Sequence, residues 1–129
     1  MQTKIKGPDK WGPWAWHLLH SVSIGDLSEI NEKDKYYYYL FYKIIGKILP
    51  CIICKYHYNE LFKENMLITD EITRKSIIKW TWELHNNINN MLNKNINISL
   101  DKCIKLNKKV RNNENFIFLN AMFNSFSND

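Results

Sequence analysis

Cysteine, glycine and proline are scarce in this 129-residue chain, which has three cysteines, four glycines and three prolines. Three cysteines are too few, and odd in number, for a secreted disulfide scaffold, so bridges are not expected to hold the fold together. No apolar run approaches the length that crosses a bilayer, and the first ten residues are polar, without an export signal. The sequence therefore predicts a soluble protein.

Internal boundaries are also lacking. No segment rich in Pro, Gly or Ser divides the chain, and no internal repeat is visible. Hydrophobic residues make up 45% of the 15.5-kDa chain, which is enough to pack one domain over residues 1–129. An alternating strand pattern of useful length is absent too.

Apolar residues recur instead at intervals of three and four, which indicates helices. The predicted helices cover residues 9–24, about 32–49, 51–65, about 69–92 and 99–111, followed by a helically spaced apolar stretch at 116–126. We expect Asp9, Asn31 and Ser99 to act as N-caps, and Pro50 to end the second helix and open the third. The fold class is all-α, with a four-helix bundle core over about 9–98 and a C-terminal helical extension over about 99–129.

The second helix is expected to bury one apolar stripe. Its members are Tyr37, Leu40, Phe41, Ile44, Ile45 and Ile48. The corresponding stripe of the fourth helix is Ile77, Trp80, Leu84, Ile88 and Leu92.

The net charge is +5 and the pI is about 9.1, which favours an anionic partner, but no stretch concentrates five or six basic residues. Aromatics reach 14%, with five Trp and seven Tyr. They can fill a core, wall a pocket for a flat cofactor, or stack on bases. A basic nucleic-acid-binding bundle is therefore one hypothesis.

The segment "PCIIC" places Cys51 and Cys54 three positions apart. Two thiols at a helix start can form a reversible disulfide, and the helix N-terminus lowers the pKa of the first thiol. The same spacing is half of a zinc site, which Cys103 and His57 could complete in a zinc-stabilised binding module. The pair can also be two small buried side chains. Because no strand precedes Leu49, a thioredoxin-like fold is disfavoured.

Two further motifs accompany the pair. "WGPWAWHLLH" carries Trp11, Gly12, Trp16 and His20, and "HNNINNMLNK" carries His85, Asn86, Asn89 and Lys94. Tryptophans, Trp14 included, can wall a flat ring, and glycine lets the backbone approach a cofactor. The histidine and amides share one helical face, where they can meet an adenosine, and Lys94 can meet a pyrophosphate.

In order, spacing and helical placement, these three motifs resemble those of the Erv/ALR family of FAD-linked sulfhydryl oxidases over residues 11 to about 98. That family holds FAD in a four-helix bundle, with the CxxC disulfide against the isoalloxazine ring. The chain also looks similar to the small oxidases of large cytoplasmic DNA viruses, such as African swine fever virus, which points to a viral protein.

The resemblance implies a thiol oxidase that makes disulfides in protein dithiols and passes the electrons through FAD to oxygen, giving hydrogen peroxide. Cys51 would exchange with the substrate and Cys54 would contact the flavin. The residues implied in FAD binding are Gly12, Trp16, His20, His57, His85, Asn86, Asn89 and Lys94; no metal is implied.

The resemblance also implies partners. One is a thioredoxin-like or other redox carrier protein. The other is a second copy of the chain in a homodimer, which could form through an aromatic surface that includes Tyr36 to Tyr39. Neither nucleic acid nor a membrane span is expected. The implied location is the host cytoplasm, the virus factory or the virion.

The sequence departs from many cellular members of that family in two ways. They have a second disulfide near the positions of Trp82 and Ser99, and this bridge is expected to be absent. Cys103 has no evident disulfide partner in the chain. In order of preference, we expect it to be a thiol without a redox role, a cysteine in an intermolecular disulfide, or a shuttle cysteine that relays electrons.

Overall fold

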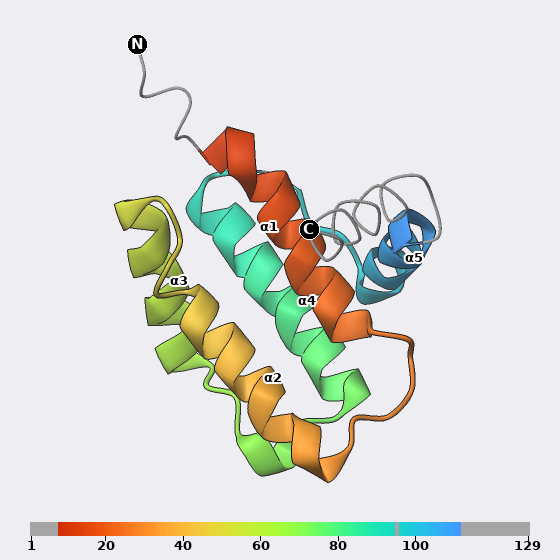
Figure 1. Ribbon diagram of the computed structural model, residues 1–129. Coiled ribbons are helices and arrows are strands. Elements are labelled where there is room, and N and C mark those ends of the chain that lie inside the picture. Colours follow the sequence, from red (N-terminus) through yellow and green to blue (C-terminus); the bar gives the residue numbers. More distant parts are fainter. Residues whose placement is uncertain (1–7, 95, 112–129) are drawn as a thin grey trace, which may run out of the picture.

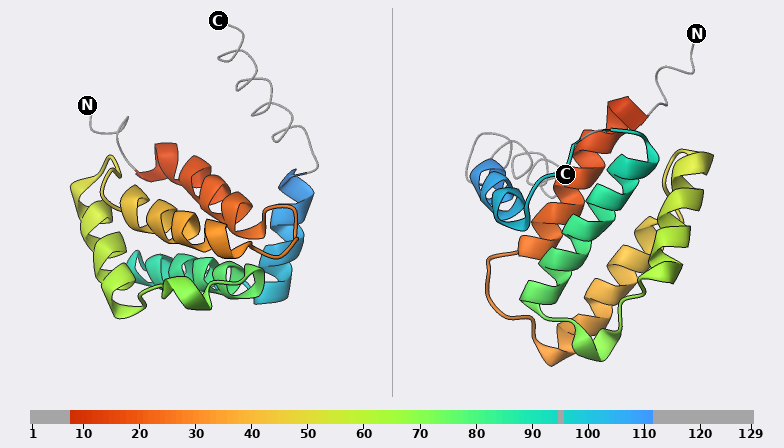
Figure 2. Two further views of the ribbon diagram at one scale, coloured as in Figure 1. Left: turned by 60° about the horizontal axis from the view of Figure 1, so that its bottom comes forward. Right: turned by 180° about the vertical axis from the view of Figure 1, so that it is seen from behind.

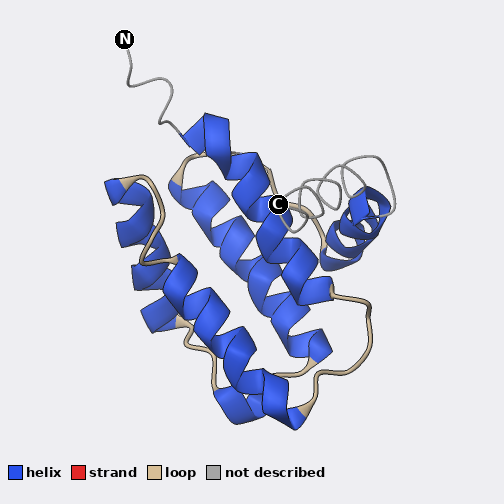
Figure 3. Cartoon of the chain, in the orientation of Figure 1, coloured by secondary structure: helices blue, strands red, loops and turns tan. Residues whose placement is uncertain are grey.

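The described part of the chain, residues 8–94 and 96–111 of a computed structural model, consists of helices and their connections (Figures 1 and 3). In chain order the elements are α1 (Pro8–Ile24), α2 (Glu32–Ile45), α3 (Ile52–Glu64), the 3₁₀ helix η2 (Thr69–Glu71), α4 (Arg74–Met91) and α5 (Leu100–Arg111). No strand occurs in these two segments, so the all-α prediction is confirmed. The apolar stretch at 116–126 lies outside the described residues.

Helices α1 to α4 form a bundle, and α5 lies against one side of it (Figures 1 and 2). α1 and α4 run side by side in opposite directions and share the most extensive contact, while α5 packs on both. The expected four core helices are therefore present, and the predicted C-terminal extension is helical over its described part, Leu100–Arg111. The antiparallel order brings the start of α1, the end of α4 and the start of α3 to the same end of the bundle.

Two buried tyrosines connect three of the helices. The hydroxyl of Tyr42 on α2 donates to the backbone oxygen of Leu19 on α1 at 2.7 Å, and Tyr58 on α3 donates to the backbone oxygen of Tyr42 at 2.6 Å. Trp80 of α4 meets the Tyr42 ring edge-on, with 5.3 Å between ring centroids. Because both buried hydroxyls are paired, these rings fill the core without an unsatisfied polar group.

The buried face of α2 differs from the predicted stripe. Tyr42 is fully buried, whereas Tyr37, Ile44 and Ile48 are exposed. One reason is that α2 ends at Ile45, so Ile48 lies beyond the helix. The other is that four consecutive tyrosines offer an aromatic side chain to every face, so spacing alone could not select the buried one.

The starts of α1 and α3 also correct the prediction. α1 begins at Pro8, so Asp9 lies within its first turn and is not the N-cap. The N-cap of α3 is Cys51, whose sulfur accepts a hydrogen bond from the backbone N–H of Cys54 at 3.3 Å. Pro50 therefore precedes the cap and does not open the helix.

α4 starts later than predicted, and α5 starts as predicted. Thr73 and Ser76 form a reciprocal capping box at the start of α4, after η2 has occupied the predicted start near residue 69. Ser99 caps α5, because its hydroxyl accepts from the backbone N–H of Lys102 at 3.2 Å. Asn31 occupies the N-cap position of α2 without a side-chain hydrogen bond.

The buried guanidinium of Arg74 at the start of α4 holds the α1–α2 connection. It donates to the backbone oxygens of Ser23 and Ser28, both at 2.8 Å, and to the hydroxyl of Tyr38 at 3.1 Å. Gly25 adopts φ +53° at the end of α1, and a Cβ there would also meet this guanidinium. These contacts fix where α1 ends along α4, and so the register of the two helices that line the site.

Candidate functional site

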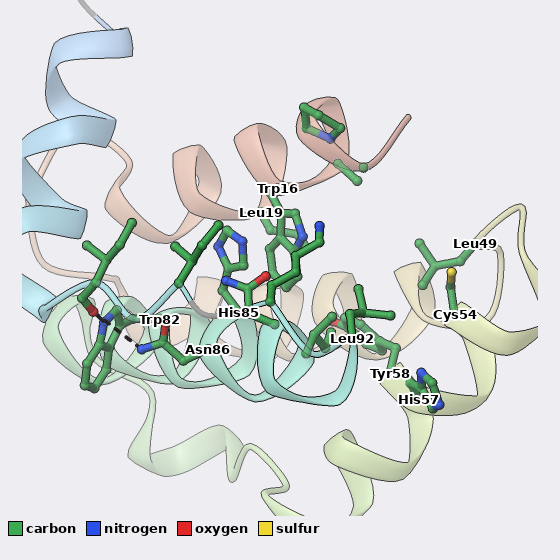
Figure 4. A pocket seen from close by; sticks show the side chains of 18 of the residues that line it. Trp16, Leu19, Leu49, Cys54, His57, Tyr58, Trp82, His85, Asn86 and Leu92 are labelled. Carbon is green, nitrogen blue, oxygen red and sulfur yellow. Dashed lines mark hydrogen bonds between the residues drawn. The ribbon is translucent and has the colours of Figure 1, made fainter. Parts of the chain in front are cut away.

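A cavity of about 520 Å³ lies where the starts of α1 and α3 meet the end of α4 and the following residues 92–98 (Figure 4). Its size falls within the range of small-molecule sites, roughly 300–1,000 Å³. Eight of the ten predicted site residues line it: Gly12, Trp16, Cys54, His57, His85, Asn86, Asn89 and Lys94. The structure thus brings together residues from three motifs that are far apart in the sequence.

Cys51 and His20 do not line the cavity. Cys51 is the N-cap of α3, three residues before the cavity-lining Cys54, and His20 contacts the cavity-lining His85 without lining the cavity itself. Trp14, expected as a wall, is 54% exposed and does not contribute to the lining, whereas Trp11 does.

One wall is a stacked pair of rings from α1 and α4. Trp16 and His85 lie nearly parallel, at 7°, with 3.8 Å between their centroids. Nε2 of His20 is 2.8 Å from Nδ1 of His85, and this hydrogen bond helps to fix the orientation of the His85 ring. This arrangement leaves a firm aromatic surface at the cavity.

Burial keeps both histidines neutral. Desolvation, together with the nearby His85 and His17, lowers the pKa of His20 from 6.5 to about 3. Desolvation and the charge of Lys94 lower the pKa of His85 to about 4. At neutral pH each ring therefore has one N–H and one acceptor nitrogen.

The polar groups of the cavity come mainly from α4. Asn86 and Asn89 present amides on the same helical face as His85, and Lys94 follows at the turn after the helix. That turn is closed by the backbone N–H of Lys94, which donates to the backbone oxygen of Asn89 at 2.9 Å. Amides can donate and accept, and the ammonium group supplies positive charge to an anionic ligand.

Trp82 completes this face and was missed by the sequence motifs. Its indole Nε1 donates to the backbone oxygen of Ile98 at 2.6 Å, which ties the chain after α4 back to the helix. Trp82 lines the cavity at the end away from Cys54 (Figure 4). Its positions relative to His85, Asn86 and Asn89, at intervals of three, four and seven, are a helical signal that could have identified it.

The backbone at Gly12 leaves room in the cavity. Apart from the backbone of its own helix, a Cβ built at this position would meet no atom of the described residues within 4 Å, and Gly12 is part of the lining. The space therefore belongs to the cavity and is not filled by a neighbouring helix.

The two thiols at the start of α3 have opposite environments. Burial raises the pKa of Cys51, but hydrogen bonds from the Cys54 thiol and from the N–H groups of Cys54 and Ile53 outweigh this, and the net pKa is lowered. The pKa of Cys54 is raised by burial, by the hydrogen bond that its thiol donates to Cys51, and by the negative charge on Cys51. The first proton lost by the pair therefore comes from Cys51, while Cys54 faces the cavity.

Cys103 lies on α5, apart from the pair. It is buried, its sulfur is 3.7 Å from Nδ1 of His20, and it lines the opposite side of the cavity from α3. No group of three His, Cys, Asp or Glu side chains within residues 8–94 and 96–111 is arranged to hold a metal ion. The proposed zinc set of Cys51, Cys54, Cys103 and His57 is thus not assembled.

Comparison with known proteins identifies the architecture. The model of the Erv1/Alr family matches residues 14–115, which include both cysteines of the pair and the cavity face of α4. The chain belongs to the Erv1/Alr family. The resemblance inferred from the three motifs is confirmed.

Individual relatives agree with this membership. The chain is 34% identical over 84 residues to a probable FAD-linked sulfhydryl oxidase of Acanthamoeba polyphaga mimivirus. It is 33% identical over 86 residues to the FAD-linked sulfhydryl oxidase of an African swine fever virus isolate from Kenya. The matched segments cover 64% and 67% of this chain, and 58% and 71% of the respective relatives. The chain thus spans less than two thirds of the mimivirus protein.

Proposed function

We propose that this Erv1/Alr protein is an FAD-dependent thiol oxidase that makes disulfides in protein dithiols, with oxygen as electron acceptor and hydrogen peroxide as product. The observation that carries the proposal is the position of Cys54: this thiol of a CxxC pair lines a cavity whose other walls are stacked rings and amides. The relatives named FAD-linked sulfhydryl oxidases support the same activity.

The cavity residues fit FAD chemically. The Trp16–His85 stack offers an aromatic wall, Asn86 and Asn89 offer hydrogen bonds, and Lys94 offers charge to a pyrophosphate. The row of side chains from Cys54 to Trp82 gives the site an elongated form that suits a dinucleotide (Figure 4). The open space at Gly12 gives such a ligand access to the backbone of α1. We propose that these residues hold the cofactor and that His20 acts through His85.

The cysteine pair performs the thiol exchange. A substrate thiolate attacks Sγ of Cys51 in the Cys51–Cys54 disulfide, the bond between the two cysteines breaks, and Cys54 is released towards the cavity. The second substrate thiolate then attacks the substrate sulfur of the mixed disulfide and releases Cys51. The substrate has lost two electrons and two protons, and the enzyme pair has gained them. The lowered pKa of Cys51 makes its thiolate the better leaving group in the second step. Bound FAD supplies the two-electron acceptor that returns the pair to a disulfide.

The visible absorption spectrum and oxygen uptake test this function. We expect the purified protein to show flavin absorption and to consume oxygen with dithiothreitol, with one hydrogen peroxide formed per disulfide. A colourless protein that takes up no FAD on refolding would contradict the proposal.

The two alternative functions, zinc binding and nucleic-acid binding, gain no support. The zinc ligands are dispersed among the described residues, and the best-packed aromatic side chains lie in the core or at the cavity.

We further propose that a protein dithiol docks on the exposed start of α3. Ile52 is 85% exposed, and Ile48, Ile53 and Tyr56 around Cys51 are also exposed. Lys47 adds positive charge beside them. An apolar surface of this kind next to a reactive sulfur suits a redox carrier with apolar and acidic residues around its dithiol.

Kinetics with two substrates test the docking surface. We expect Ile52→Asp to raise KM for reduced thioredoxin several-fold and to leave the rate with dithiothreitol unchanged, because only the protein substrate contacts this surface. Ile68→Asp is the control, since Ile68 is also exposed but follows the far end of α3. Equal KM values for reduced thioredoxin in the two variants would exclude the start of α3 as the docking surface.

We also propose a homodimer through the exposed Tyr36 and Tyr37 of α2 and action in the host cytoplasm or virus factory. The viral relatives support the location. In residues 8–94 and 96–111 no helix has the length and apolar character of a membrane span. Light scattering of wild type and Tyr37→Asp tests the dimer, which the variant is expected to weaken.

A further inference from the structure

Four side chains form a continuous row that ends at His85 of the Trp16–His85 wall. Asn107 Nδ2 is 3.6 Å from Cys103 Sγ, Cys103 Sγ is 3.7 Å from His20 Nδ1, and His20 Nε2 is 2.8 Å from His85 Nδ1. His20 is 5% exposed and Cys103 is 9% exposed, so water has little access to this row. The direction in which the hydrogens point along it is therefore decided by the side chains themselves.

Asn107 sets the direction at one end. Its Nδ2 also lies 2.8 Å from the backbone oxygen of Cys103, and a carbonyl oxygen can only accept. The nitrogen of the amide is thus the atom that faces Cys103, and the sulfur accepts from it. The thiol hydrogen then remains for Nδ1 of His20.

The opposite direction is less favourable. If Nδ1 of His20 donated to Cys103, one sulfur would accept two hydrogen bonds while its own hydrogen had no acceptor. A thiol sulfur is a weak acceptor, whereas an unprotonated imidazole nitrogen accepts well. Burial lowers the pKa of His20 and raises that of Cys103, so neither an imidazolium nor a thiolate alters this comparison at neutral pH.

We infer that Cys103 fixes the tautomers of His20 and His85, so that His85 presents an Nε2–H donor to the cavity. With Nδ1 of His20 accepting from the thiol, its Nε2–H donates to Nδ1 of His85. The hydrogen of His85 is then on Nε2, which has no hydrogen-bond partner among the described residues and belongs to a cavity-lining ring. Reversal of the row would replace this donor with a lone pair.

Cys103 is thereby a positioning residue, which acts on a ligand through two histidines from other helices. Stacking on Trp16 fixes the plane of the His85 ring, so the donor has a defined direction. Identification of the ligand as FAD, with an acceptor atom facing Nε2–H, rests on the proposed function. The tautomer assignment does not.

Nitrogen NMR of the histidine-labelled full-length protein tests the assignment directly, because protonated and unprotonated ring nitrogens resonate in separate regions. His17→Gln and His57→Gln spectra identify the remaining two rings. We expect Nε2–H for both His20 and His85 in the wild type. Nδ1–H at His85 would overturn the inference.

Two substitutions separate hydrogen bonding from packing. Cys103→Ser keeps a donor, so we expect wild-type tautomers; Cys103→Ala removes it, so we expect the row to populate both directions. Cys51→Ala is a cysteine control away from the row and should leave the tautomers unchanged. Unchanged tautomers in Cys103→Ala would show that Cys103 does not set them.

Cofactor retention gives a second readout. Loss of one directed hydrogen bond should raise the FAD dissociation constant of Cys103→Ala by about three- to tenfold, with Cys103→Ser close to wild type. Equal weakening in both variants would indicate packing and contradict the inference. A wild-type protein that binds no FAD would refute the proposed function but leave the NMR result interpretable.

Discussion

The two sides of the cavity are built differently. The histidine side, formed by Trp16, His20, His85 and Cys103, is packed between α1, α4 and α5, with its rings stacked and hydrogen-bonded. The dithiol end, formed by Cys51 and Cys54 at the start of α3, is half-buried and bordered by an isoleucine that is 85% exposed.

The electrostatics follow the same division. On the histidine side, burial lowers the pKa of both rings and keeps them neutral, so their hydrogen bonds stay the same over the physiological range. At the dithiol end, burial raises the pKa of Cys51, but the hydrogen bonds from the Cys54 thiol and from backbone N–H groups outweigh it and lower the pKa, which favours the thiolate form. Under the proposed function, the preorganised histidine side would bind the cofactor and the accessible dithiol end would exchange with the substrate.

The strongest test separates the two sides. We expect Cys54→Ser to reduce dithiol-dependent oxygen uptake by a factor on the order of a thousand or more while FAD stays bound, because the histidine side is untouched. The measurements are oxygen consumption and the flavin spectrum of the same preparation. Lys63→Ala, at the exposed far end of α3, is the control. If FAD were lost together with activity, the two sides would not be independent.

A pair of glycines sharpens the comparison. A Cβ at Gly46 would collide with the Tyr58 ring under α3, so we expect Gly46→Ala to lower the free energy of unfolding by about 1–3 kcal/mol. A Cβ at Gly12 meets no atom of the described residues beyond the backbone of its own helix, so Gly12→Ala should keep or slightly raise the stability of cofactor-free protein, as expected for alanine in a helix, yet weaken FAD binding. Urea unfolding and FAD titration measure the two effects. Normal FAD affinity of Gly12→Ala would show that the cofactor does not use this space.

The pH dependence of stability tests the histidine side alone. His20 and His85 have folded-state pKa values of about 3 and about 4, below the unfolded value of 6.5, so the unfolded state binds protons first. Their stabilising contribution is complete above pH 6.5 and is lost as pH falls towards the folded values. Between about pH 7.5 and about pH 5.5 we expect a loss of about 1 kcal/mol per histidine.

Urea midpoints of cofactor-free protein at the two pH values give this loss. The double variant His20→Gln/His85→Gln should lose less stability over the same interval, since neither substituted side chain titrates. An identical slope in the variant would mean that other groups cause the pH dependence.

The smallest predicted effect concerns the end of the cavity away from Cys54. Trp82→Phe removes the hydrogen bond to the backbone oxygen of Ile98 but keeps an aromatic ring, so we expect a loss of about 0.5–1.5 kcal/mol in unfolding free energy. Thermal unfolding measures it. Trp14→Phe, at an exposed position outside the cavity, should be nearly neutral by comparison. A similar loss in both variants would argue against the Trp82 contact.

Local patterns predicted the helices well where a cap or a clear apolar period existed. Ser99 capped α5 as expected, and Ile77 and Leu84 are buried on α4. Local patterns gave a wrong buried face for α2, because consecutive tyrosines obscured the apolar period. They also gave a wrong start for α3, because Cys51 and not a residue before Pro50 is its N-cap. Which residue becomes the N-cap depends on which side chain reaches a free backbone N–H of the first helical turn, and the spacing of residues in the sequence does not reveal this.

The sequence by itself determined that the chain is helical, that Cys51 and Cys54 form a pair at a helix start, and which face of α4 carries His85, Asn86 and Asn89. These properties arise from neighbours within a few turns, which residue order specifies directly. The family resemblance implied that Cys54 meets the cofactor, but only the tertiary structure showed that a cavity exists there and that Cys54, and not Cys51, lines it. The tertiary structure also decided that His20 serves His85 from behind and that Cys103 contacts His20 from 83 positions away. Those relations depend on how α1, α4 and α5 pack against one another, and no local period contains that information.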